Sequence, residues 1–271
     1  MRRIRLILVL GLIVAGGSLL LAHDMFLKPD QFFVAPNTEV LVRLLNGTFS
    51  QSENSIDRVR LVDVSVVSPA GRERVDTSRW SAVGDTSNFR FRTGATGTYL
   101  LGASTKPNII PLTAKEFNEY LESDGIPDAL EARRKSGELT KNVRERYAKH
   151  VTALLQVGET RSDHFTAPLG YPAEIIPQQN PYSVKTGDTI AFRLLVRGKP
   201  SANEYVLYGG RTPNGGRITQ RSTRSDTAGV ARIRISGPGT WYVKFIHMEK
   251  LSGDTAADYE STWSTVTFAI K

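Results

Sequence analysis

Four residues near the two ends of the sequence have side chains that can bind a metal ion: His23, Asp24, His247 and Glu260. Imidazole nitrogen suits the late first-row metals, and a carboxylate can supply a further oxygen ligand. The residues therefore predict a site for a divalent transition metal, with Ni, Co, Cu and Zn as the candidates. This prediction requires the fold to bring the two ends of the chain together.

Residues 1–22 have the composition of a secretory signal peptide. Arg2, Arg3 and Arg5 precede an uncharged apolar run at 6–21, and the sequence becomes polar at His23. We therefore expect a periplasmic or secreted protein, or a membrane-anchored one if the leader is not cleaved.

Cleavage after Ala22 makes His23 the first residue of the mature chain. Its free α-amine, with a pKa of roughly 8, then forms a two-nitrogen chelate with its own imidazole. The simpler alternative is that His23 is only the start of a mature tail.

His247 belongs to an expected strand at 239–248, after a Gly-Pro-Gly turn. Because side chains alternate along a strand, Trp241, Val243, Phe245 and His247 share one face, which is apolar up to the histidine. Glu260 lies where the expected last strand, 262–270, begins. We expect this carboxylate to lie near the histidine of a neighbouring strand.

Two sequence patterns recur in the same order. Residues 89–92, followed by 97–99, match residues 231–234, followed by 239–241, and residues 40–45 resemble 190–195. Together the two repeated patterns indicate two copies of one β-domain.

Short strands separated by turn residues predict a mainly β protein with two immunoglobulin-like β-sandwich domains and a helical insert between them. We expect a first sandwich at 23–110, the insert at 111–160, and a linker with the second sandwich at 161–271.

Within the insert, Thr113 and Glu116 form a capping box for one helix, and Pro127 opens a second. Apolar residues spaced from Val143 to Leu155 predict a third helix, with His150 packed on its apolar face. His164 is expected in an exposed polar loop.

Several functions are excluded or disfavoured by what the sequence contains. It has no Cys, so thiolate ligands and a thiol nucleophile are absent, and it lacks HExxH, GxSxG, P-loop and dinucleotide motifs. Its net charge of +8 is spread along the chain without a basic arm, which disfavours nucleic acid as a partner. We therefore expect a protein that is not an enzyme.

The stretch from His23 to Pro29 resembles the HDFWLxP start of an exported bacterial family of unknown function, with Met25-Phe26 in place of Phe-Trp. Further similar stretches follow in order at 117–121, 144–149, 174–177, 180–182, 198–200, 241–247 and 260–268. That family is often described as a NikM-like substrate-binding component of nickel or cobalt uptake. The resemblance implies a metal-binding protein whose partner is a membrane metal transporter.

Three functions remain. The first is capture of nickel, cobalt or copper and its delivery to a transport system. The second is a non-enzymatic immunoglobulin-like module that binds carbohydrate or protein at the cell envelope, with His23 and His247 as structural residues. The third is a copper oxidase with an amino-terminal histidine brace, which requires a second imidazole near the first.

Mass spectrometry of the exported protein tests the leader prediction. We expect a mature chain that begins at His23, because the apolar run ends at Ala22. A mature terminus well downstream of His23 would remove the main predicted ligand.

Overall fold

The computed structural model describes residues 23–271, so the predicted leader lies outside the described residues. The predicted fold class is confirmed, because strands dominate and the two α-helices are α1 (Ala114–Ser123) and α2 (Pro127–Lys135). Neither helix is long and apolar enough to cross a membrane, and no other helix in residues 23–271 is either.

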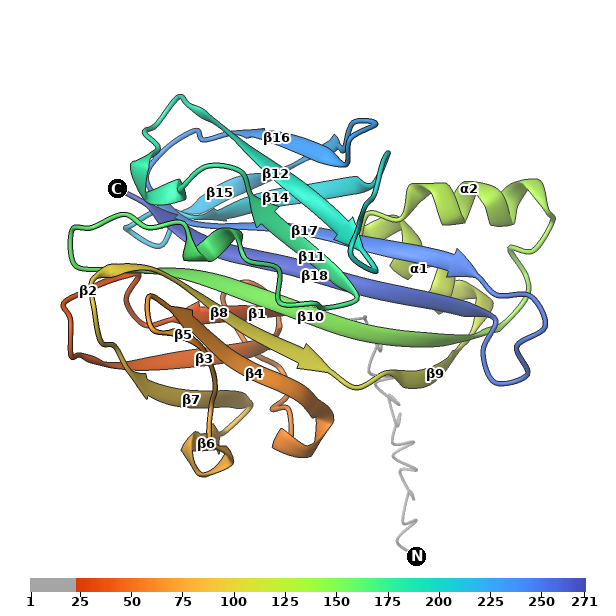
Figure 1. The fold of residues 1–271 in the computed structure, drawn as a ribbon. Helices are drawn as coiled ribbons and strands as arrows, with labels where there is room; N and C mark the ends of the chain where they lie inside the picture. The colour runs from red at the N-terminus through yellow and green to blue at the C-terminus, as the bar shows by residue number, and fades with distance from the viewer. Residues whose placement is uncertain (1–22) are drawn as a thin grey trace, which may run out of the picture.

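One large sheet runs through the whole molecule, with the strands of the second half of the chain above its centre and those of the first half below (Figure 1). In spatial order its strands are β15 (Arg217–Arg224), β14 (Tyr205–Arg211), β17 (Gly239–Lys250), β18 (Tyr259–Ile270), β10 (Val143–Val157), β8 (Gly97–Thr105), β4 (Leu61–Ser68) and β5 (Gly71–Arg74). Two short strands also pair with β10, namely β2 (Phe33–Val34) and β9 (Asn108–Leu112).

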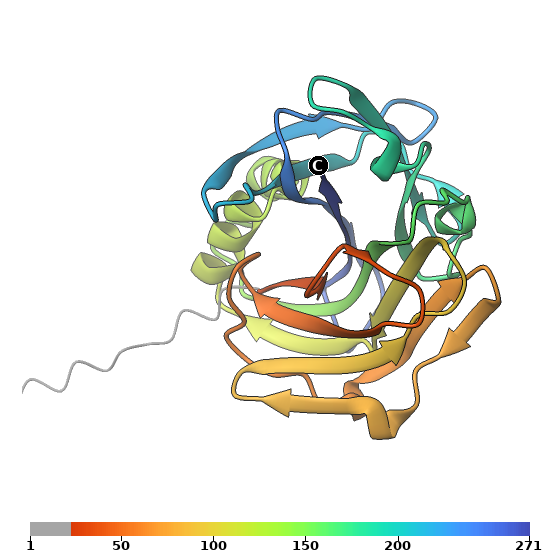
Figure 2. The same cartoon turned by 90° about the vertical axis from the view of Figure 1, so that its left-hand side faces the viewer.

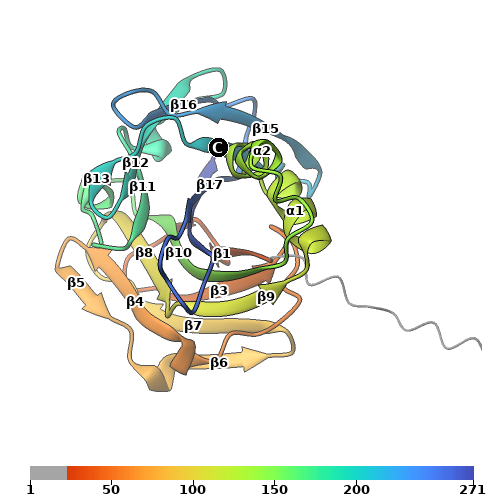
Figure 3. The ribbon, with the colours of Figure 1, turned by 90° about the vertical axis from the view of Figure 1, so that its right-hand side faces the viewer.

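Two smaller sheets pack against the large one. The first comprises β1 (Asp24–Pro29), β3 (Glu39–Gly47), β7 (Thr86–Arg92) and β6 (Trp80–Val83). The second comprises β11 (Ala173–Pro177), β12 (Thr189–Val196), β13 (Lys199–Pro200) and β16 (Val230–Arg234). End-on views show these sheets on either side of β10 and β18 (Figures 2 and 3).

Alternating side chains of the large sheet supply both hydrophobic cores. On β10, Leu155 packs in the core under β1, β3 and β7, whereas Leu154 packs in the core under β11, β12 and β16. We call the side that faces β1 the first face and the side that faces β12 the second face. The helices cover the first face beyond β1, where Phe117 and Leu121 pack against Ile246 and Trp263.

The predicted repeat is confirmed by the strand registers. Val40 pairs with Phe91 in the first small sheet, and the corresponding Ile190 pairs with Ile233 in the second. The matching segments are therefore equivalent in structure as well as in sequence.

The two halves are joined by a parallel pairing of β10 with β18, in register from Glu145↔Tyr259 to Ala153↔Thr267. The third helix predicted over 143–155 is wrong, because this segment is β10. Strands buried on both faces have nearly continuous apolar runs, and such a run also satisfies helical spacing. The capping box of α1 is confirmed, with Glu116 Oε2 accepting from Thr113 N at 2.8 Å.

Replacing Phe268 with alanine should lower the free energy of unfolding by about 3–5 kcal/mol, because this ring is fully buried on β18. Urea denaturation measures the change, and Val59→Ala, at a side chain 73% exposed, should alter it by less than about 0.5 kcal/mol. Because both cores share one sheet, we expect one unfolding transition; two separate transitions would contradict the continuous sheet.

Candidate functional site

β1 brings His23 and Asp24 onto the first face of the large sheet. The strand pairs with β3, with Asp24 opposite Gly47, and lies across β10 and β18. Thr265 Oγ1 on β18 donates to the carbonyl of Met25 at 2.9 Å, and Lys149 Nζ on β10 donates to the carbonyl of His23. Strands β10 and β18 of the large sheet thus hold the backbone at His23 and Met25 in place.

Asp24 is held by a buried ion pair. Lys244 Nζ on β17 lies 2.8 and 2.6 Å from the two carboxylate oxygens of Asp24 and 3.2 Å from Asp124 Oδ1 at the end of α1. Burial lowers the pKa of Lys244, but the charges of the two carboxylates outweigh this and hold that pKa above its usual value. Both oxygens of Asp24 are therefore already engaged.

A second lysine, Lys149, is buried beside the first. Burial lowers the pKa of its amine to about 8, although the charges of Asp24, Asp124 and Glu145 oppose the shift. Glu145 is itself buried, which raises its pKa, and it accepts from Tyr120 Oη at 3.0 Å and from Ser261 Oγ. This polar cluster lies between β1, α1 and the large sheet.

His23 lies at the edge of this cluster and lines two cavities, of about 470 and 140 Å³. Its Nδ1 is 3.3 Å from Glu53 Oε2, in the loop after β3, and the two side chains are 22% and 45% exposed. Two ligands of a tetrahedral metal ion with bonds of about 2.0–2.1 Å lie about 3.3–3.4 Å apart. The pair therefore has a spacing that suits metal coordination, and both side chains are reachable from solvent.

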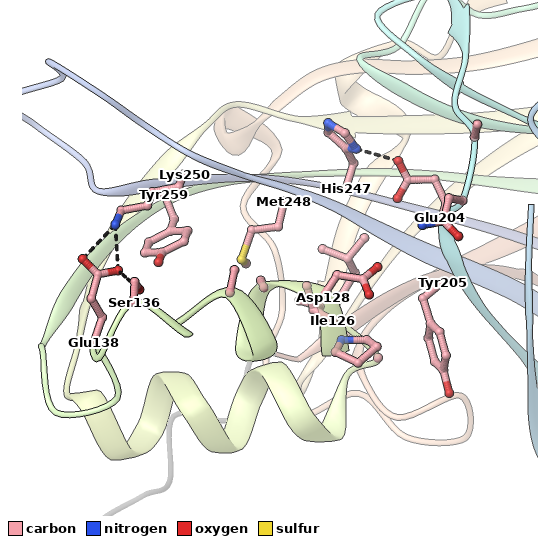
Figure 4. A pocket seen from close by; sticks show the side chains of 17 residues that line it. Ile126, Asp128, Ser136, Glu138, Glu204, Tyr205, His247, Met248, Lys250 and Tyr259 are labelled. Carbon is pink, nitrogen blue, oxygen red and sulfur yellow. Dashed lines mark hydrogen bonds and ion pairs between the residues drawn. The ribbon is translucent and has the colours of Figure 1, made fainter. Parts of the chain in front are cut away.

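The side chain of His247 lies on the second face of β17. His247 also lines a different cavity, of about 490 Å³, whose walls include α2, the residues around Glu204 and this part of β17 (Figure 4). Its Nδ1 is 2.6 Å from Glu204 Oε1, and its Nε2 is 3.2 Å from Glu249 Oε1. The hydrogen bond from Glu204 is the largest of the effects that raise the pKa of His247. Each ring nitrogen therefore contacts a carboxylate, on the face of the large sheet opposite to that of Asp24.

Glu260 also lies on the second face, opposite Glu249 on the neighbouring strand. It accepts from Arg146 Nη1 at 3.3 Å and from Arg197 Nη2 at 3.2 Å, and Arg197 also binds Glu249 at 2.7 Å. His247 and Glu260 thus belong to one charged network without touching each other.

The four predicted ligands therefore separate into two pairs on opposite faces of the large sheet, because β17 is regular and His247 is three residues from Lys244. No group of three or more His, Asp or Glu side chains within residues 23–271 is arranged to hold a metal ion. A single four-residue site is not assembled, and the two histidines have separate carboxylate partners, Glu53 for His23 and Glu204 with Glu249 for His247.

The sequence analysis missed Glu53, Asp124 and the two buried lysines. A polar loop glutamate gives no signal, since only the hairpin after β3 carries Glu53 to His23. Lys244 did have a signal, because it is a lone charge among Tyr242, Val243, Phe245 and Ile246. A charge at such a position requires a partner.

The remaining two histidines are removed from this site. His150 is on the second face of β10 with Nδ1 2.8 Å from Ser104 Oγ, and burial lowers its pKa to about 4. His164 is in a short 3₁₀ turn, Nδ1 2.9 Å from Ser162 Oγ.

Comparisons with known proteins identify a family and no activity. The model of the family described as "Domain of unknown function (DUF4198)" matches residues 20–249. A search of curated proteins gave no significant match.

Solved structures are similar only at a distance. The chain aligns with trypsin-activated alpha-2-macroglobulin from Escherichia coli at 10% identity and a TM-score of 0.24, covering 92% of this chain and 16% of the other. It aligns with a DUF4785 family protein from Legionella pneumophila at 10% identity and a TM-score of 0.26, covering 81% and 50%. A tetra-tandem repeat of a large adhesion protein aligns at 11% identity and a TM-score of 0.23, covering 91% and 49%. The chain thus spans half or less of each protein, and TM-scores this low support no argument.

The pKa of Lys149 predicts a specific pH dependence of stability. Its pKa is about 8 in the folded chain and near 10.5 in the unfolded chain, so the unfolded chain binds more protons between these values. The free energy of unfolding should therefore rise with pH in this window, by about 1 kcal/mol per unit. Urea denaturation at pH 8.0 and 9.5 should show this rise for the unmodified protein and for Lys115→Met, a control at an exposed lysine, but not for Lys149→Met. Equal slopes in all three would contradict the assignment.

Proposed function

The chain belongs to the DUF4198 family, and we propose that it is an exported protein that binds a divalent transition-metal ion at His23 and delivers it to a transport system. The observation that supports this most is the pairing of His23 Nδ1 with Glu53 Oε2 at 3.3 Å beside an open cavity. An imidazole and a carboxylate at this spacing are suitable ligands for such an ion.

The predicted cleavage after Ala22 would complete the donor set. The freed α-amine and the imidazole of His23 belong to one residue, so both can bind one ion. With Glu53 they supply two nitrogens and one oxygen, which leaves positions open for water or for a receiving protein. An open position suits a protein that must release its metal.

In this proposal Asp24 supports the site and is not itself a ligand. Because Lys244 engages both of its oxygens, Asp24 acts as a positioning residue that holds the start of β1 against the large sheet. Lys149 has a similar role through the carbonyl of His23. These two contacts hold the carbonyl of His23 and the residue that follows it, which reduces the entropy lost when metal binds.

The resemblance to NikM-like components of nickel or cobalt uptake favours nickel or cobalt as the cargo and a membrane metal transporter as the partner. Copper and zinc prefer the same nitrogen donors, so they must be compared directly. His247 and Glu260 lie on the opposite face and are not part of this proposal.

Isothermal titration of the mature, tag-free protein with Ni(II), Co(II), Cu(II) and Zn(II) tests the proposal. We expect sub-micromolar binding of at least one ion. The His23→Ala substitution should weaken this binding about 100-fold and Glu53→Gln about tenfold. These factors correspond to about 2.8 and about 1.4 kcal/mol of binding free energy. A chain with one alanine added before His23 should bind the metal about as weakly as His23→Ala, because the α-amine is then no longer on the histidine. His247→Ala and Glu260→Gln serve as matched controls and should leave the affinity unchanged.

Other results would favour the other functions. Weak binding that no His23 or Glu53 variant alters would contradict metal capture and favour an immunoglobulin-like module for carbohydrate or protein. A histidine-brace oxidase needs a second imidazole beside His23, and His247 lies on the opposite face of the sheet, bound to Glu204.

A further inference from the structure

Two arginines face each other across the hairpin of β14 and β15 at the cavity beside His23. Arg211 and Arg217 are directly opposite in the antiparallel register, and both line the 470 Å³ cavity. Like charges placed directly opposite each other in a sheet are destabilising. The pairing of Arg211 with Arg217 therefore lowers the stability of the fold unless an anion binds between them.

The described part of the chain supplies no carboxylate for either arginine. Arg211 Nε donates to Ser50 Oγ at 2.7 Å, and its Nη1 makes a long contact of 3.4 Å with the carbonyl of Gly215. Ser50 lines the same cavity as Glu53, so this bond holds the Arg211 guanidinium at the wall of that cavity. Burial lowers the pKa of Lys28, and the positive charges of Arg211 and Arg43 lower it further.

The cavity has the form of a site for a small organic molecule. Its volume is within the range of ordinary ligand pockets, which is about 300–1,000 Å³. Three packed rings, Phe26, Phe49 and Tyr242, contribute apolar surface to it, with centroids 4.8–5.3 Å apart. The carboxylates of Asp24 and Asp124 share the one positive charge of Lys244, and Glu53 contacts His23, so among the charged groups that line the cavity the two arginines are the ones without an ion-pair partner in the described residues.

We propose that this cavity binds the metal as a complex with a small organic carboxylate, which is held by Arg211 and Arg217 while His23 and Glu53 hold the metal. The inference rests on the proposed function and names the chemical form of its cargo. The planar guanidinium matches a carboxylate through two parallel hydrogen bonds, and a polycarboxylate has further oxygens that chelate a divalent ion. His23, Glu53 and both arginines line this one cavity, so the proposal places the metal and its carboxylate ligand together in it.

Equilibrium dialysis against radiolabelled citrate, with and without one equivalent of Ni(II), tests this. We expect the mature protein to retain citrate strongly only when Ni(II) is present. The double variant Arg211→Gln, Arg217→Gln should lower that retention about 100-fold, because the loss of each charged contact weakens binding about tenfold. Its affinity for Ni(II) alone should change by less than about twofold. Arg221→Gln is the matched control, because this exposed arginine is on the same strand β15 but does not line the cavity.

The urea midpoint of each variant checks that it folds, and removal of the like-charge pair should leave the midpoint of the double variant unchanged or raised. If Ni(II) binds through His23 but citrate is not retained, or is retained equally by the double variant, this inference is wrong and the proposed function stands. If Ni(II) does not bind at all, both are wrong. Citrate retention that phosphate displaces at equal concentration would also overturn the carboxylate assignment.

Discussion

The arrangement of the first face depends on one buried ion cluster, in which Lys244 lies between Asp24 and Asp124. Its three members come from different parts of the chain: β1 of the first half, β17 of the second half, and the end of α1 in the insert. Lys244 is only 5% exposed and is the cation that both carboxylates share, so its loss would leave two mostly buried carboxylates without it. The cluster therefore fixes where the two halves and the helices meet, and His23 is the residue next to it.

Burying these charges carries a desolvation penalty, so apolar side chains of similar size would often stabilise the contact between the three elements equally well. Charges do, however, impose a register that apolar packing does not. β1 could slide by two residues and keep Met25 and Leu27 in contact with apolar neighbours, but Asp24 would then lose Lys244. The same reasoning applies to Lys149, whose bond to the carbonyl of His23 holds the first described residue in place. Precise placement of His23 is what its proposed role as an amino-terminal ligand requires.

Much of the fold could be predicted from sequence, and the reasons for success and failure are physical. The repeat was recognisable because equivalent strands have the same alternation of apolar and polar side chains, and the registers of Val40 and Ile190 confirm it. The strand β10 was mistaken for a helix because a strand buried on both faces has no period of two. The four predicted ligands were grouped as one site, whereas the structure places His247 and Glu260 on the opposite face of the large sheet from Asp24. Strand parity within β17 indicates opposite faces for Lys244 and His247, but which face meets β1 is decided by tertiary packing alone.

The most direct test of the account is the location of the metal. Anomalous diffraction from crystals of the mature protein with nickel would locate the ion without assumptions about affinity. The account predicts one strong peak within about 2.0–2.2 Å of nitrogen from His23 and of Glu53 oxygen. A peak at His247 and Glu204 on the second face, with none at His23, would contradict it.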